Sequence, residues 1–352
     1  MIKSLIINLG STSSKIAVFE DSTSAFETTI SHNSGELAKF KSTYDQLQFR
    51  TDAITKTIEE AGYVLADLDA ICSRGGPLKP VESGVYLIDD EAIKDAADPE
   101  IGGRHPSALG VVIAGELSNK LNIPAYFVDP VSTDELVDEA RYSGYKGIPR
   151  DGLFHALNQK SMARKVAVEL GKPYEELNLI GIHMGGGVCV AAHRKGRVID
   201  AYNVTEDGCF SMDRCGNLPT TDLLKLAYSG IPYDELKKKL TTQGGVYSYL
   251  GTKDFKEVER KVYAGDEEAI GVFNAMVFQH VKCIGAMAAI MKFEVDAIFL
   301  TGGIAHSKMM CSALKSYTDG FAKTFILPGE NEMQSLADGV MRVAKGYKPK
   351  KY

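Results

Sequence analysis

The sequence predicts an α/β protein of two domains that repeat one plan and face each other across a cleft. A length of 352 residues favours two domains of ordinary size, each with a sizeable core. Two hairpins with glycine-containing turns lie in different halves of the chain, at residues 5–19 and 179–192. A third glycine turn, with Gly302 and Gly303, follows another apolar run. Because a hairpin with a glycine turn occurs once in each half of the chain, we expect two copies of one domain.

The first hairpin joins residues 5–7 to residues 16–19 around Gly10 and a row of hydroxyl side chains that ends at Lys15. Successive amides in such a turn form a concave donor site, and glycine lets the backbone approach an anion closely. We interpret the turn as a phosphate-binding site, with an ordinary polar hairpin as the alternative.

The composition excludes several classes of partner. Apolar residues make up 44% and charged residues 24% of the chain, which is typical of a globular protein. A net charge of −6 offers no basic surface for nucleic acid. We find no uninterrupted apolar stretch of about 18 residues and no signal peptide, so we expect a cytoplasmic protein without a membrane partner. The six cysteines lack C-x-x-C spacing, which indicates reduced and mostly buried thiols.

The first half of the chain offers two candidate charged ligands. A helical pattern at 44–62 precedes a short strand at 69–72, which delivers Arg74 into a glycine-rich loop. The guanidinium fork suits a carboxylate or phosphate, although a surface arginine in a turn is the alternative. After a helix at 106–121, the strand at 123–128 ends at Asp129, where α/β folds collect ligands and metals. Asp129 capping the turn before proline is the simpler reading.

The second half begins near residues 148–152, the best candidate for a boundary. A helix from about 153 to 170 carries His155 in its first turn, where backbone amides favour an anion. An irregular loop at 207–219 places Arg214 between apolar and sulfur neighbours, and loops of this kind often carry function. Further helices are expected at 220–229, 233–240, 266–293 and 333–345, with strands at 295–300 and 324–328 and a frayed basic tail at 347–352.

Five segments match the motifs of one enzyme family. They are the Asn-x-Gly-Ser-Thr-Ser-Ser-Lys run of 8–15, Arg-Gly-Gly-x-Leu-Lys-Pro at 74–80 with Gly-Val-Tyr at 84–86, Val-Asp-Pro-Val at 128–131 with Asp-Glu at 134–135, Phe-His-Ala-Leu-Asn-Gln-Lys at 154–160, and Pro-Gly-Glu-x-Glu-Met at 328–333. On these motifs the chain resembles the acetate and butyrate kinases, and the butyrate kinase branch is the closer match. The resemblance covers essentially the whole chain in the family's order.

The resemblance implies that butyrate, or a short or branched relative, reacts with ATP to give an acyl phosphate and ADP in the presence of magnesium. It implies duplicated ribonuclease H-like domains of the actin-like ATPase superfamily of acetate and sugar kinases, with the nucleotide in a central cleft. The domains would be 1–149 with about 333–352, and 150–332 with the adenosine site. Members are commonly dimers, so a homodimer or a larger assembly of dimers is expected.

The resemblance also implies residue roles. His155 and Arg214 resemble transition-state ligands, Arg74 a substrate-carboxylate arginine, and His105 a histidine near the substrate. The residues that it assigns to phosphates and nucleotide are Asn8, Gly10, Ser11, Ser13 and Lys15 in the first turn, His183, Gly185, Gly186 and Gly187 in the second, and Gly302, Gly303 and Ile304 beside adenosine. Asp129 and Glu332 resemble the acidic groups that hold magnesium, with Glu330 as a possible substitute.

Three departures from the family pattern leave the acyl-chain preference open. Leu9 stands where the branch usually has proline, Ser14 where it often has threonine, and Cys215 where serine commonly follows the arginine. None of them removes a charged group. The alternative functions are a kinase of acetate, propionate or a sugar on the same fold, and a non-catalytic actin-like nucleotide switch. No aspartate general base of a sugar kinase is evident in the sequence.

Overall fold

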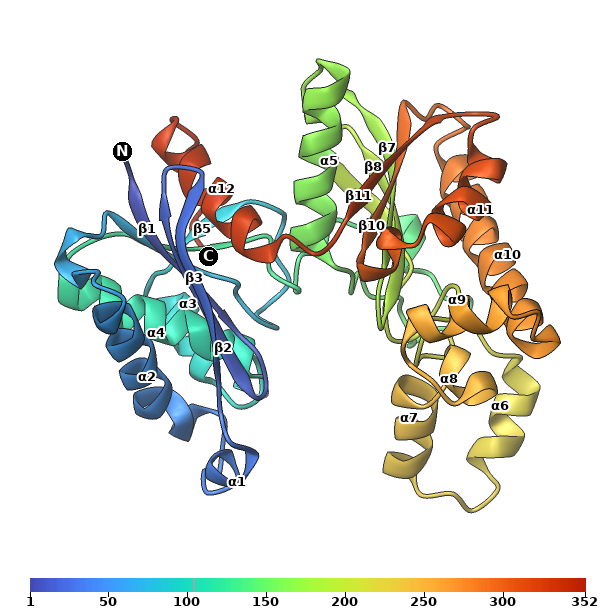
Figure 1. Cartoon of the computed structure of the whole chain (residues 1–352), viewed down its shortest axis with the longest axis horizontal. Helices are drawn as coiled ribbons and strands as arrows, with labels where there is room; N and C mark the ends of the chain where they lie inside the picture. Colours follow the sequence, from blue (N-terminus) through green and yellow to red (C-terminus); the bar gives the residue numbers. More distant parts are fainter. Residues whose placement is uncertain (104) are drawn as a thin grey trace. The chain divides into compact units, whose positions relative to one another are not determined.

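A computed structural model describes residues 1–103 and 105–352. It divides into two compact units, each with its own sheet (Figure 1). Unit 1 comprises Met1–Asp134 and Asn331–Tyr352, and unit 2 comprises Glu135–Glu330.

The sheet of unit 1 has six strands in the order β3-β2-β1-β4-β6-β5. The strands are β1 (Lys3–Leu9), β2 (Ser13–Glu20), β3 (Thr23–Ser31), β4 (Ala70–Ser73), β5 (Val85–Leu87) and β6 (Ala125–Val128). The helices are α1 (Ser34–Leu37), α2 (Leu47–Glu60), α3 (Asp90–Ala97), α4 (Pro106–Leu121) and α12 (Glu332–Ala344), with 3-10 turns at Tyr44–Gln46 and Leu65–Asp67.

The sheet of unit 2 has five strands in the order β11-β10-β7-β8-β9. The strands are β7 (Asn178–Met184), β8 (Val188–Arg194), β9 (Arg197–Ala201), β10 (Ala297–Gly302) and β11 (Lys323–Pro328). The helices are α5 (Ala156–Leu170), α6 (Thr220–Ala227), α7 (Tyr233–Thr242), α8 (Gly245–Leu250), α9 (Phe255–Tyr263), α10 (Glu267–Ile290) and α11 (Lys308–Thr318), with 3-10 turns at Asp138–Arg141, Tyr174–Glu176 and Gly303–His306.

The two sheets share one topology. In each, three consecutive antiparallel strands are followed by two strands that pair in parallel on the other side of the first, so β3-β2-β1-β4-β6 corresponds to β9-β8-β7-β10-β11. The predicted glycine turns are the β1–β2 and β7–β8 connections. The prediction of a duplicated α/β fold is therefore confirmed.

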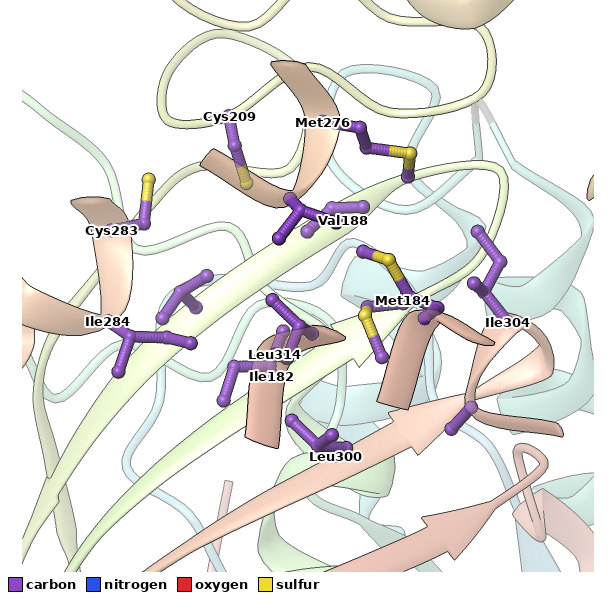
Figure 2. Close-up of a cluster of buried hydrophobic side chains, with 14 of the residues drawn as sticks. Ile182, Met184, Val188, Cys209, Met276, Cys283, Ile284, Leu300, Ile304 and Leu314 are labelled. Carbon is purple, nitrogen blue, oxygen red and sulfur yellow. The ribbon is translucent and has the colours of Figure 1, made fainter. Parts of the chain in front are cut away.

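Successive side chains of the first strand in each sheet point to opposite faces of that sheet. On β1, Ile7 and Leu9 pack under α4, whereas the side chain of Asn8 reaches α12 on the opposite face. On β7, Ile182 and Met184 join the buried cluster of α10 and α11 (Figure 2), whereas His183 contacts α5. The last residues of β1 and β7 thus present polar groups on one face above a packed core on the other.

Helix α10 is a core helix of unit 2. By length and composition alone it is, among the described residues, the one helix that could cross a membrane. Its Met276 and Ile284 lie in the buried cluster that also contains Leu300 of β10 (Figure 2). The apolar side chains of α10 thus pack against the sheet of unit 2.

His280 on α10 makes unit 2 sensitive to acid. The side chain is fully buried; Nδ1 donates to the Met276 carbonyl at 2.7 Å, and Nε2 has no partner within the described chain. Burial lowers the pKa of His280 from 6.5 to about 4. The unfolded chain therefore binds a proton more readily than the folded one, and stability is full above pH 6.5 and is lost as the pH falls towards 4.

We expect His280→Leu to reduce this acid sensitivity. The loss of unfolding free energy between about pH 7 and pH 4 should be smaller in the variant by about 3 kcal/mol, because it has no proton to gain. Urea denaturation at both pH values measures the difference. An identical loss in both proteins would show that His280 is not the group responsible.

Residues 135–149 belong to unit 2, whereas the sequence placed them in the first domain. The Glu135 carboxylate accepts from the Lys160 ammonium on α5 and from the Val198 amide, the latter at 2.8 Å. The Val137 amide donates to the Ile199 carbonyl at 3.0 Å. These contacts attach the segment to β9 and α5 ahead of the expected boundary.

The C-terminal tail is not frayed, so that expectation was wrong. Lys350 exchanges backbone hydrogen bonds with β5, donating to the Val85 carbonyl and accepting from the Leu87 amide. The Tyr352 hydroxyl donates to Asp95 at 2.9 Å and accepts from the Lys79 amide at 2.9 Å. The tail thus closes the edge of the unit 1 sheet.

Candidate functional site

A polar cluster forms at the carboxyl ends of β1 and β4 in unit 1. Asn8 Nδ2 donates to Glu332 Oε2 at 2.6 Å, and Arg74 Nη2 lies 3.1 Å from Glu332 Oε1. Glu332 begins α12, directly after Asn331 in the left-handed conformation (φ 51°). The structure therefore brings together three of the predicted residues, with Glu332 between the other two.

His105 caps α4 near this cluster. Its Nδ1 lies 3.1 Å from the Ser107 amide, which donates to it. Burial, and secondarily the positive charge of Arg74, lowers the pKa of His105. A neutral imidazole is therefore expected at pH 7, so His105 offers a hydrogen bond rather than a charge.

Lys15 lies on the same face of the sheet as Asn8, because the two are cross-strand partners. Its ammonium is 2.8 Å from Glu27 Oε1 on β3, and the two side chains are 41% and 39% exposed. The structure thus holds Lys15 at a carboxylate, whereas the sequence reasoning assigned it to the phosphate turn.

Asp129 and Glu332 have separate partners. Asp129 is buried with φ 39°, its Oδ1 accepts from the Gly84 amide at 2.7 Å, and Oδ2 lies 4.0 Å from Arg342 Nη2. Arg342 is ten residues along α12 from Glu332, or about 15 Å along the axis. Among the described residues no group of three or more His, Cys, Asp or Glu side chains is arranged to hold a metal. The expected magnesium role of Asp129 and Glu332 therefore stays a prediction.

In unit 2, two predicted histidines stack beside the second glycine turn. The rings of His155 and His183 are 3.7 Å apart between centroids and 16° from parallel. Asn158 Oδ1 accepts from His183 Nδ1 at 2.9 Å, while its Nδ2 donates to the carbonyls of Gly329 and Glu330. Asn158, which the sequence reasoning did not assign, thus orients His183.

Cys189 orients His155. Its Sγ lies 3.2 Å from His155 Nδ1 and accepts from Gln159 Nε2 at 3.4 Å. Burial raises the pKa of the Cys189 thiol to about 11, so the thiol is protonated at neutral pH and can donate to Nδ1. The ring proton of a neutral His155 then lies on Nε2.

Arg214 lies against the second glycine turn. Its Nη1 donates to the Val204 carbonyl at 2.8 Å. A Cβ on Gly187 would sit 2.5 Å from Nη1 and 2.5 Å from Val204 Cγ2. Glycine therefore lets the guanidinium lie against the turn, because any side chain at this position would displace it.

A pocket of about 290 Å³ adjoins the turn and is partly lined by predicted residues, Gly185, Gly186, Gly303 and Ile304. Gly302, next to the lining residue Gly303, has φ 85°, and a Cβ there would meet the Met184 carbonyl at 2.4 Å. The lining residues that sequence reasoning missed are Met212, Lys253, Asp254, Phe255, Lys256, Glu259, His306 and Ser307.

A family model of the acetokinase family matches residues 136–319, just over half of the chain. The chain belongs to the acetokinase family. Membership indicates a carboxylate kinase, that is, a phosphotransferase with ATP as donor.

Solved structures share the fold over nearly the whole chain. Porphyromonas gingivalis acetate kinase is similar with 17% identity and a TM-score of 0.79, covering 97% of this chain and 100% of that one. A propionate kinase from Francisella tularensis subsp. tularensis SCHU S4 has 17% identity and a TM-score of 0.71, with 96% and 99% covered. A ROK family protein from Streptococcus pneumoniae TIGR4, solved with sucrose, has 13% identity and a TM-score of 0.51, with 98% and 100% covered. The fold of this chain is thus also similar to that of a ROK family protein.

The unpredicted residues that line the pocket of this acetokinase-family chain belong to no sequence motif that could have identified them. Lys253, Phe255 and Glu259 come from α9 and the loop before it, and Ser307 precedes α11. No short motif joins them, because their proximity depends on the tertiary fold, in which the Ser307 hydroxyl donates to Glu259 Oε1 at 2.6 Å. Asn158 and Cys189, by contrast, lie inside segments that the sequence analysis had already singled out.

Proposed function

We propose that the protein transfers the γ-phosphoryl group of ATP, reversibly and in line, to the carboxylate of butyrate or a short or branched relative. The observation that carries the proposal is the unit 2 constellation in which His155 stacks on His183 and Arg214 abuts Gly187 of the glycine turn. Together with family membership, it supports a site for a transferring phosphoryl group.

The chemistry explains why these residue types are useful. A carboxylate acceptor is already ionised at pH 7, so no general base is required. The obstacle is the approach of one anion to another. Catalysis therefore depends on positioning and on positive groups around the equatorial oxygens of the phosphoryl group. A histidine N–H and an arginine fork supply such groups.

We assign His155 and Arg214 to the transferring phosphoryl group, and Arg74 with His105 to the acid. Arg74 can exchange Glu332 for the substrate carboxylate, since both are carboxylates that suit its fork. Asn8, Gly10, Ser11 and Ser13 are assigned to phosphates in the first turn, and the glycines of 185–187 in the second. Gly303 and Ile304, at the 290 Å³ pocket, are assigned to adenosine.

The acidic residues fit magnesium unequally. Mg²⁺ is usually held by one or two carboxylates together with substrate phosphates and water. Glu332 fits this pattern, because its side chain is 19% exposed and already lies among polar groups. Asp129 is buried and bound to the Gly84 amide, which fits a contact through water or a role in shaping the strand end. When bound, the metal would neutralise phosphate charge.

The preference for butyrate rests on the motif resemblance, and acetate or propionate is an equally supported alternative because structures of both kinds of kinase are similar to this chain. An acyl-hydroxamate assay over straight and branched acids of two to six carbons distinguishes them. We expect the highest kcat/KM with four-carbon acids. A highest kcat/KM with acetate or propionate would identify that acid as the substrate in place of butyrate. Turnover of hexoses but of no fatty acid would overturn the proposal.

We further propose a homodimer. Helix α6 has no buried residue among those described, and Leu224 and Tyr228 are 54% and 88% exposed. Sedimentation velocity tests this, and a monomer at micromolar concentration would contradict it.

A further inference from the structure

Arg50 is a fully buried arginine of α2 that donates to the backbone of the first glycine turn. Its Nη1 lies 3.1 Å from the Gly10 carbonyl and 3.0 Å from the Ser13 carbonyl, and Nη2 lies 2.9 Å from the Ser11 carbonyl. Nη1 also reaches Ser14 Oγ at 3.3 Å, and Nε donates to Gln46 Oε1 at 2.9 Å. One side chain thus contacts three carbonyls of one turn.

These contacts determine which way the turn's peptide groups face. The remaining carbonyl, that of Thr12, accepts from the His32 amide at 2.9 Å. Ser11 and Thr12 are exposed, and in the described part of the chain neither of their amides donates to a protein acceptor. The carbonyls are therefore held inward while two N–H groups remain for a ligand, and adjacent free amides in a turn suit an anion.

Arg50 also places a charge beneath the turn. No carboxylate of the described residues lies within ion-pair distance of its guanidinium, and burial alone lowers its pKa. His32, whose Nε2 lies 2.8 Å from Ser14 Oγ, has a pKa lowered by burial and by Arg50, so it adds no second positive charge. A buried cation without an acidic partner is unfavourable unless dipoles or an anion compensate it. The carbonyl dipoles compensate in part, and an anion above the turn would add to them.

We propose that Arg50 is the positioning residue of the first phosphate turn. It orients the amides of Ser11 and Thr12 towards a nucleotide phosphate and strengthens that contact with its buried charge, without touching the phosphate itself. The inference rests on the proposed function for the identity of the anion.

Calorimetric titration of ATP and of adenosine into wild type and Arg50→Met tests the proposal. Methionine fills much of the space but has no donor and no charge. We expect ATP affinity to fall by about 10- to 100-fold, because several charge-assisted contacts that orient the turn are lost, and adenosine affinity to stay unchanged. Arg50→Lys keeps the charge but not the fork, so its ATP affinity should lie between the two.

Ile54→Ala is the matched control. Ile54 is fully buried one turn further along α2 and packs in the core of unit 1, so its loss should destabilise the unit without altering the preference for ATP over adenosine. Urea denaturation of each variant identifies a folding defect, and Arg50→Lys carries the test if Arg50→Met does not fold.

The outcomes separate the two proposals. If wild type does not bind ATP, the proposed function fails. If wild type binds ATP and a folded Arg50 variant binds it equally well, the role of Arg50 is overturned while the function stands. A parallel loss of ATP and adenosine affinity would also overturn it, because a purely structural arginine would affect both.

Discussion

Replacing Arg214 with alanine should lower kcat for acyl phosphate formation by about 10²–10³-fold, with little change in ATP affinity. Arg214 lies against Gly187 and is anchored by the Val204 carbonyl, so its fork faces the second glycine turn with only a weak acidic contact, 3.9 Å from Asp213. A group that acts on charge developed during transfer affects kcat more than ground-state binding. Initial rates and calorimetric ATP titration together measure the two effects.

Two further variants sharpen this experiment. Arg214→Lys keeps one positive charge but cannot donate from a planar fork, so its kcat should lie between those of wild type and alanine. Arg194→Ala removes an exposed arginine at the end of β8 and should leave kcat unchanged. Retained turnover in Arg214→Ala would contradict the assigned role, and weakened ATP binding with normal kcat would make Arg214 a nucleotide ligand instead.

The parts of the fold that were predictable are those in which local chemistry and burial agree. β1, β2, β7 and β8 are rich in apolar residues and mostly buried, and their turns contain glycine, so the apolar runs and the turn residues gave the same answer. β3 was not predicted, because its residues, from Thr23 to Ser31, are exposed or half-buried at the edge of the sheet. An edge strand is determined by its pairing with β2, which no local pattern records.

The site residues, too, were predictable where a local sequence pattern marks them and not where they depend on long-range contacts. His155 lies in a family motif, His183 in a predicted glycine hairpin and Arg214 in a predicted irregular loop, and the structure places all three around one glycine turn. Arg50 was missed because it lies within an ordinary helical pattern, and its function depends on α2 packing beneath a turn far away in sequence. Long-range side-chain to backbone contacts of this kind have no sequence period. The boundary at 135 was missed for a similar reason, since it depends on a buried ion pair.

That ion pair should account for a large share of the stability of unit 2. The side chains of Lys160 and Glu135 are 0% and 3% exposed, and each has a second partner: Lys160 donates to the Gly196 carbonyl at 2.9 Å, and Glu135 accepts from the Val198 amide at 2.8 Å. Glu135→Ala leaves the ammonium buried without its carboxylate. We expect the free energy of unfolding to fall by about 3–5 kcal/mol in urea denaturation.

Removing both charges should restore much of this loss. In the double variant Glu135→Leu with Lys160→Met, no ion remains to be desolvated, and replacement of a buried pair by apolar groups of similar volume is often neutral or stabilising. Two backbone groups, the Gly196 carbonyl and the Val198 amide, then lose their partners at about 1–3 kcal/mol each, so recovery should be partial. A single-variant loss below about 1 kcal/mol would indicate that water or a neighbouring group satisfies Lys160, since such a value is typical of an exposed pair. A double variant as unstable as the single one would show that the backbone contacts, rather than the charges, attach residues 135–149 to unit 2.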